Sequence, residues 1–134
     1  MVGIINGQLR PVLVRDRSIA DVVPAAEKAL AKAGLTIDDI GLFELNEAFA
    51  VQVVAFLDHF GIPDDSDKVN KYGGAIATGH PLASSGVRLM NQLARQFEEN
   101  PDVRYGMTAM CIGIGMGGAV IWENPHHADY GKEN

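Results

Sequence analysis

The sequence contains a single cysteine, Cys111, among its 134 residues. One cysteine excludes an internal disulfide bond and any metal site built from several cysteines, which leaves packing or reactivity as its role. No run of residues approaches the roughly 20 consecutive apolar residues that a membrane-spanning helix needs. The first residues, MVGIINGQLRPVLVR, also lack the basic region, apolar core and cleavage site of a signal peptide. We therefore expect a cytoplasmic protein without a membrane span.

Basic residues are few, since 11 Lys and Arg stand against 17 Asp and Glu, and the formal net charge is −6. The basic residues form no cluster, so no nucleic-acid partner is expected. Hydrophobic residues make up 47% and charged residues 21% of the chain, which favours neither disorder nor a membrane protein. The length suits one domain with a single hydrophobic core.

The spacing of apolar residues predicts alternating helices and strands. The predicted helices cover residues 18–33, 46–60 and 82–99, and the predicted strands cover residues 40–45, 104–112 and 117–123. Residues 71–77 are expected to form a short strand or an extended entry to the third helix. Because helices and strands alternate and two strands close the chain, we predict an α/β fold with a mixed β-sheet.

Three residues with chemical potential, Asn46, His80 and Cys111, fall at or near predicted strand ends. In α/β sheets, functional residues gather at the carboxyl ends of the strands, so these three are expected to converge. Each also has a purely structural explanation. Asn46 suits the N-cap of a helix, His80 suits a turn between glycine and proline, and Cys111 suits the core as a small apolar residue.

The stretch CIGIGMGG, residues 111–118, favours a chemical role for Cys111. Its glycines leave backbone N–H groups uncrowded beside a thiol, as the stabilisation of an oxyanion requires. The stretch leads into another predicted strand rather than a helix, so it does not indicate a dinucleotide-binding loop.

Three motifs, NEAFA at 46–50, GGAIATGHPLASSGVR at 73–88 and CIGIGMGG at 111–118, resemble in order and spacing the C-terminal half of the thiolases. This is the family of acetyl-CoA acetyltransferases and 3-ketoacyl-CoA thiolases, which cleave 3-ketoacyl-CoA with CoA or run the reverse Claisen condensation. The resemblance covers about residues 20–124. It implies a thiolase-like layered fold, a mixed sheet with helices packed on it that forms one half of an αβαβα arrangement. The sequences HPLASSG and IWENP look more like those of the fatty-acid β-oxidation branch of the family than those of the acetoacetyl-CoA branch.

The resemblance also implies roles for four residues. His80 and Asn46 would belong to a first oxyanion hole that polarises the thioester carbonyl, with the asparagine acting through a water molecule. Cys111 would be the general acid/base that takes a proton from the CoA thiol or from the α-carbon of an acetyl group. The N–H of Gly113 would serve a second oxyanion hole. Coenzyme A thioesters would be substrates, and no resident cofactor or metal is expected.

The resemblance further implies that a second, nucleophilic cysteine lies in an N-terminal half that these 134 residues do not include. The isolated chain is therefore expected to be inactive, to expose a surface that the other half covers, and to self-associate as the family's homo-oligomers do. That half would be a separate subunit or belong to a longer reading frame. The alternatives are a catalytically silent, thiolase-like interaction module or a truncated gene product.

Two further expectations concern the pocket and the chain ends. Ala83 and Ile114 stand where thiolases usually carry glycine, which affects the expected acyl-chain preference. Residues 1–134 are predicted to form one thiolase C-terminal domain, with 1–17 as a partly ordered lead-in and 125–134 as a loose tail.

Overall fold

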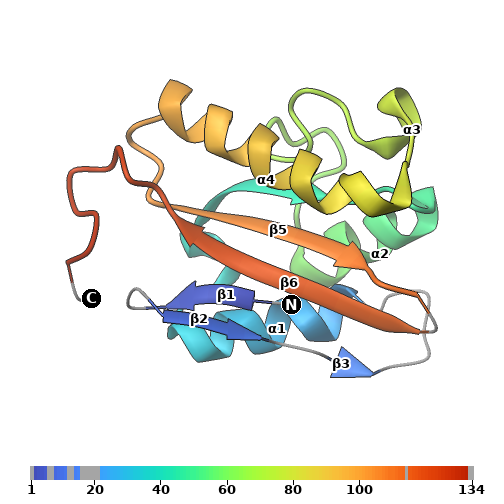
Figure 1. The fold of residues 1–134 in the computed structure, drawn as a ribbon, viewed down its shortest axis with the longest axis horizontal. Coiled ribbons are helices and arrows are strands. Elements are labelled where there is room, and N and C mark those ends of the chain that lie inside the picture. The colour runs from blue at the N-terminus through green and yellow to red at the C-terminus, as the bar shows by residue number, and fades with distance from the viewer. Residues whose placement is uncertain (1, 6–7, 12–13, 16–21, 114, 133–134) are drawn as a thin grey trace.

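The structure, a computed structural model, describes residues 2–5, 8–11, 14–15, 22–113 and 115–132, with side chains from residue 22 onward (Figure 1). The strands are β1 (Val2–Ile5), β2 (Gln8–Pro11), β3 (Val14–Arg15), β4 (Ile40–Leu45), β5 (Tyr105–Cys111) and β6 (Met116–Glu123). The helices are α1 (Val22–Ala33), the short 3-10 helix η1 (Ile37–Asp39), α2 (Ala50–Phe60), α3 (Ala75–Thr78) and α4 (Leu82–Glu99).

The main sheet has four strands in the order β3-β6-β5-β4. Strands β4 and β5 are parallel, whereas β6 is antiparallel to both β5 and β3. Strands β1 and β2 form a separate antiparallel pair. The sheet is therefore mixed and carries helices, which confirms the predicted α/β class with a mixed β-sheet.

The two faces of the main sheet pack against different helices, α1 and α4 (Figure 1). Phe43 and Met107 point to the larger core, which the buried apolar side chains of α1 complete. Leu42 points to the opposite face and packs against Leu93 and Phe97 of α4. This alternation follows the two-residue period of a strand, in which successive side chains point to opposite faces of the sheet.

Helix α4 has an apolar stripe that lies directly against β5. A side chain at Gly106 would overlap Leu93 and Phe97, so glycine at this position lets the helix and strand come into close contact. Helix α4 spans the predicted residues, and α1 ends as predicted before Gly34, which has a φ of 68°.

Two local predictions are wrong. The second helix begins at Ala50 rather than residue 46, because the N–H of Asn46 donates to the carbonyl of Ala109 and continues the pairing of β4 with β5. Residues 71–77 contain no strand in the structure, and α3 begins at Ala75. The extended pairing lies earlier, where Val69 forms a parallel bridge with Phe43. The strands β1, β2 and β3 were not predicted.

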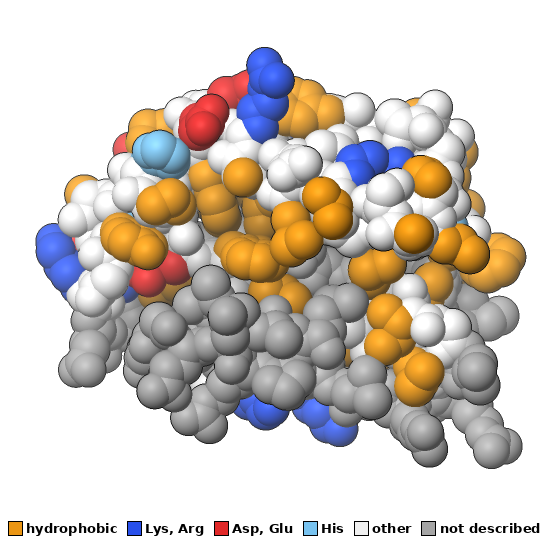
Figure 2. Space-filling model, viewed as in Figure 1, with side chains coloured by type: hydrophobic (Ala, Val, Ile, Leu, Met, Phe, Trp, Pro, Cys, Tyr) orange, Lys and Arg blue, Asp and Glu red, His pale blue; other side chains and the backbone are white. Residues whose placement is uncertain are grey.

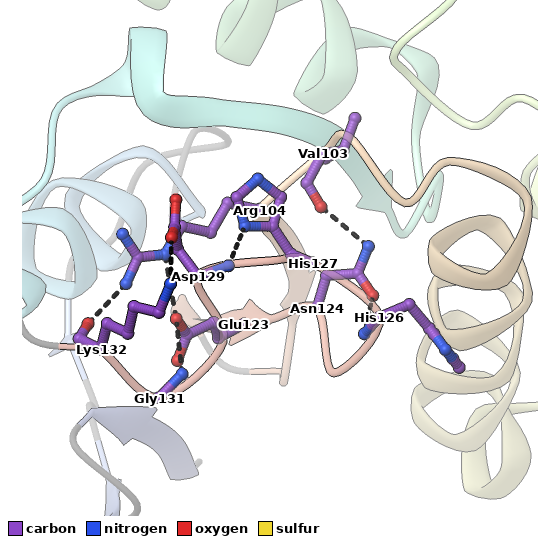
Figure 3. Close-up of polar contacts among 9 residues, drawn as sticks. All are labelled: Val103, Arg104, Glu123, Asn124, His126, His127, Asp129, Gly131 and Lys132. Carbon is purple, nitrogen blue, oxygen red and sulfur yellow. Dashed lines mark hydrogen bonds and ion pairs between the residues drawn. The ribbon is translucent and has the colours of Figure 1, made fainter.

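After β6, Asn124 anchors the chain (Figure 3). Its side chain is fully buried, and Nδ2 donates to the carbonyl oxygens of Phe97, Asn100 and Val103, the last at 2.8 Å. Its Oδ1 accepts the N–H of His126 at 2.9 Å. One side chain therefore connects the end of β6 to the turn between α4 and β5.

Ionic contacts hold the segment that follows (Figure 3). Arg104 Nε donates to Glu123 Oε1 at 3.0 Å, and Arg104 Nη2 donates to the carbonyl of Lys132 at 2.6 Å. Lys132 Nζ in turn lies 2.7 Å from Asp129 Oδ1.

The division of the chain into lead-in, domain and tail stays a prediction. In the described part of the chain, no helix is long and apolar enough to cross a membrane.

Candidate active site

Asn46 lies at the carboxyl end of β4 and is 2% exposed. Its backbone N–H is fixed by the carbonyl of Ala109 at 2.8 Å, so the residue is tied to the neighbouring strand β5. Its side-chain Nδ2 lies 3.3 Å from Nε2 of His80, and its Oδ1 is buried without a hydrogen-bond partner among the described residues. The amide is therefore directed at the histidine instead of capping a helix.

His80 lies in the short connection between α3 and α4. The preceding Gly79 has a φ of 90°, a conformation that residues with a Cβ rarely adopt, and the following Pro81 restricts the backbone. The ring Nδ1 lies 2.7 Å from Oγ of Ser85, which is fully buried in the first turns of α4. Both ring nitrogens therefore have polar neighbours, and the ring is held between β4 and α4.

Glu47 holds the loop that leads to His80. Its carboxylate accepts a hydrogen bond from Nδ2 of Asn70 at 2.8 Å and another from the N–H of Ile76 at 2.9 Å. A Cβ at Gly74 would overlap this carboxylate, so glycine at this position allows the loop to approach it.

Arg88 holds the same loop from α4. Its Nη1 donates to Oγ1 of Thr78 at 2.8 Å and to the carbonyl of Gly79 at 2.5 Å. The backbone immediately before His80 is thus fixed by a charged side chain that is itself anchored on a helix.

Cys111 ends β5 and is half-buried, with Gly117 of β6 as its register partner. It lies two residues beyond Ala109, the residue that accepts from Asn46, so the cysteine and the asparagine lie at the same edge of the sheet. Gly113 follows in an exposed turn with a φ of 85°. The structure therefore brings Asn46 and His80 into contact, with Cys111 and Gly113 on the neighbouring strand end. No hydrogen bond joins Cys111 to either of the other two in the described part of the chain.

A second polar cluster lies beneath α4. Glu44 is fully buried, and its Oε1 accepts from Nε2 of Gln96 at 2.6 Å. Burial raises the pKa of Glu44 from its ordinary value of 4.5 to about 7, although the bond from Gln96 and the charge of Arg88 act in the opposite direction. The carboxyl thus lies in an environment that favours its neutral form.

Glu44 should make the stability of the chain depend on pH. Between pH 4.5 and 7 the folded chain retains a proton on Glu44 that the unfolded chain has lost, so the free energy of unfolding should fall as pH rises and level off above 7. The total effect should be about 3 kcal/mol. Urea unfolding over this range should show that Glu44→Gln flattens the decrease, whereas the exposed Glu98→Gln leaves it unchanged. Identical pH profiles for both variants would contradict this assignment.

The sequence patterns did not single out Glu44, Glu47, Ser85 or Arg88. The sequence did contain a signal for Ser85 and Arg88. Both lie in the predicted helix that follows His80, and because they are three residues apart they share one face of that helix. Glu44 and Glu47 lie in or beside a recognised motif, but their loop and helix partners are distant in sequence. Among the described residues, no group of three or more His, Cys, Asp or Glu could hold a metal ion.

Comparison with known proteins identifies the family of the chain. The family model described as "Thiolase, C-terminal domain" matches residues 15–124. Curated relatives named 3-ketoacyl-CoA thiolase, from Pseudoalteromonas translucida, Photobacterium profundum and Yersinia enterocolitica, are each 53% identical to the chain over 102 residues. The matched part is 75% of this chain and 26% of each relative, so the chain spans about a quarter of the length of the relatives. The resemblance seen in the three motifs is confirmed, and the chain belongs to the thiolase family through its C-terminal domain.

Proposed function

We propose that the chain supplies the C-terminal half of a thiolase-type active site. That site would transfer an acyl group between 3-ketoacyl-CoA or acetyl-CoA and CoA, in fatty-acid β-oxidation or in the reverse Claisen condensation. The observation that carries this proposal is the pairing of Asn46 with His80 at 3.3 Å, at the edge of the sheet where β5 ends in Cys111. Membership of the thiolase family, and relatives named 3-ketoacyl-CoA thiolase, support it.

Asn46 and His80 would polarise the thioester carbonyl. Fixed dipoles aimed at an oxygen stabilise the negative charge that develops there, and they need no reorganisation when they are already held in place. His80 is held by its neighbours in the loop and in α4, and Asn46 is held by β5. The buried Oδ1 of Asn46, which has no partner among the described residues, is an acceptor to which a water molecule could donate. This supports the expectation that the asparagine acts through a water.

Cys111 would exchange the proton, and Gly113 would supply a backbone N–H. A half-buried thiol at a strand end is accessible to a substrate, and it can act as general acid and base if it contacts the CoA thiol or the acetyl α-carbon. The glycine turn that follows leaves its backbone open to a second oxyanion. The reaction, as proposed, uses coenzyme A thioesters as substrates and needs no resident cofactor.

The remaining part of a thiolase is the proposed partner, in the same chain or as a separate subunit. Several large hydrophobic side chains on or directly before α2, α3 and α4 are exposed, among them Phe49 and Ile76 at 67% and Leu82 at 78%. Figure 2 shows hydrophobic side chains at the end of the molecule where Figure 1 places α3 and the start of α4. Exposed apolar side chains that gather in this way indicate a surface that another part covers. Self-association and a cytoplasmic location are part of the same proposal.

The isolated chain should form no acyl-enzyme, because Cys111 is assigned to proton transfer rather than to nucleophilic attack. We expect incubation with acetyl-CoA to leave the intact mass of the purified chain unchanged, while a full-length 3-ketoacyl-CoA thiolase gains one acetyl group. Cys111→Ser serves as the control for adducts elsewhere on the chain. A stoichiometric thioester on Cys111 that CoA removes would overturn the assignment.

A further inference from the structure

Arg88 binds the loop before His80 with only one of its three nitrogens. Its Nη1 donates to Oγ1 of Thr78 and to the carbonyl of Gly79. Its Nε and Nη2 are buried and have no hydrogen-bond partner among the described residues. These two atoms form one edge of the planar guanidinium, along which two N–H groups point in the same direction. Such an edge is suited to a carboxylate or to neighbouring oxygen acceptors.

Buried acceptors without a donor lie along the same face of α4. Residues 88, 92 and 96 are spaced by four, so their side chains follow one another along the helix. Within the described part of the chain, Oε1 of Gln92 and Oε1 of Gln96 are buried and unpaired. The same is true of Oε2 of Glu44, whose other carboxyl oxygen accepts from Gln96. We call these four side chains, Glu44, Arg88, Gln92 and Gln96, the buried polar row.

The buried polar row contains two groups that can carry opposite charges. The charge of Arg88 favours the ionised form of Glu44, and the charge of Glu47, directly after β4, opposes it. Strand β5 places the uncharged Thr108 opposite Glu44. Tyr72, which also interacts with the charge of Glu44, is a neutral phenol near pH 7. Arg88 is therefore the positive charge through which Glu44 can act on its surroundings.

Unpaired donors and acceptors in one buried place are unfavourable unless something joins them. The described atoms of Arg88 and Glu44 form no direct bond, so a small polar bridge is required. Water is such a bridge, because a buried water molecule makes about three hydrogen bonds, both as donor and as acceptor. It can accept from the N–H groups of Arg88 and donate to the orphan oxygens of Glu44 and Gln92.

We propose that Glu44 is a positioning residue for His80 and that it acts through ordered water and Arg88. The water anchors one edge of the guanidinium in the buried polar row, while Nη1 holds the carbonyl of Gly79 immediately before His80. An arginine fixed on both sides holds this loop more firmly than one fixed by Nη1 alone. The consequence for catalysis rests on the proposed function, in which the ring of His80 must meet a thioester oxygen.

Two pairs of variants separate this role from ordinary changes of charge on α4. Arg88→Lys keeps the positive charge but removes the edge formed by Nε and Nη2. Arg95→Lys makes the same change on a side chain that is 76% exposed and pairs with Glu99 at the surface. Glu44→Gln keeps the shape of the carboxyl but removes its charge, and Glu98→Gln does so at an exposed position.

The coupling can be measured in the isolated chain by ¹H–¹⁵N NMR of the arginine Nε–H groups. Arg88→Lys identifies the signal of Arg88, because the spectrum then lacks it. We expect this proton to exchange with solvent on the order of 100-fold more slowly than that of Arg95. Its signal should shift as the pH rises through about 7, where Glu44 loses its proton. Glu44→Gln should abolish that shift, whereas Glu98→Gln should leave it unchanged.

Three results would overturn the proposal. The first is an Nε–H of Arg88 that exchanges as fast as that of Arg95. The second is a pH-dependent shift that persists in folded Glu44→Gln. The third is a signal in the unmodified chain that does not shift around pH 7, which decides the question even if Glu44→Gln does not fold. A crystal structure of the chain tests the bridge itself: we expect ordered water on the Nε and Nη2 edge, and a direct contact with protein atoms instead would refute it.

Kinetics separates this proposal from the proposed function. In an enzyme completed with the remaining N-terminal part of a thiolase, Arg88→Lys should lower kcat on the order of 100-fold with little change in KM. Glu44→Gln should lower it on the order of 10-fold, as the loss of one hydrogen bond implies, and Arg95→Lys should retain the rate. The double variant should be no slower than Arg88→Lys, because both changes interrupt one connection. Additive losses would contradict the coupling. Absence of activity in every completed enzyme would refute the proposed function and leave the NMR result standing.

Discussion

Replacing His80 with alanine should lower the rate of acyl transfer by a factor on the order of 100 to 1,000 in an enzyme completed with the remaining N-terminal part of a thiolase. The imidazole contributes a donor to the developing oxyanion, and alanine offers nothing in its place. The stability of the chain should change far less, because the ring is only half-buried and its loop keeps the bonds from Glu47 and Arg88. Initial rates of thiolysis and thermal unfolding curves would measure the two effects.

His59→Ala is the matched control for this change. His59 lies on α2, where its exposed ring pairs with Glu27 of α1 at 2.9 Å, away from the sheet edge that carries Asn46. Its replacement should leave the rate within a few-fold. If His80→Ala retained activity to the same extent while its melting temperature fell by many degrees, His80 would be a structural residue.

The change Cys111→Ser should separate the two halves of the reaction. Serine nearly conserves the volume of cysteine but replaces the thiol with a much weaker acid, so proton exchange should slow on the order of 100- to 10,000-fold. Acylation of the nucleophile from the other half should persist, because that step depends on the oxyanion holes and on the nucleophile's own activation. A pre-steady-state experiment should therefore show a normal acylation burst followed by a stalled second step.

Two outcomes would count against this role of Cys111. Equal loss of both half-reactions would indicate misfolding or a purely structural cysteine, which is the alternative that its partial burial at the end of β5 leaves open. Full activity in both half-reactions would remove the thiol from the mechanism.

The main elements of the fold could be predicted because each has a local pattern. Helix α4 repeats apolar residues on one face, and β4 is a short apolar run between turn signals. The start of α2 could not be predicted in this way, because Asn46 is committed to the backbone of β5, a strand more than 60 residues away in the sequence. Local propensity carries no information about such a bond.

The candidate site was predictable to a similar degree. Asn46, His80 and Cys111 each stood beside a strand end or among restricted residues, and the structure places the first two in contact. Glu47 was not predictable, since its partners Asn70 and Ile76 meet it only through the tertiary fold. The same holds for the pKa of Glu44, which depends on burial beneath α4. Residues that support a site are recognised only from their contacts in the folded chain, whereas residues that carry chemistry can be recognised from their type and their spacing in the sequence.

Reconstitution tests the central claim most directly. The chain should be mixed with the complementary N-terminal part of a 3-ketoacyl-CoA thiolase, such as the one from Photobacterium profundum, and thiolysis of acetoacetyl-CoA should be followed by loss of the substrate. We expect no turnover from either part alone, turnover from the mixture, and its loss when the chain carries His80→Ala. A stable complex that contains both parts and remains inactive would contradict the account and would favour a catalytically silent interaction module.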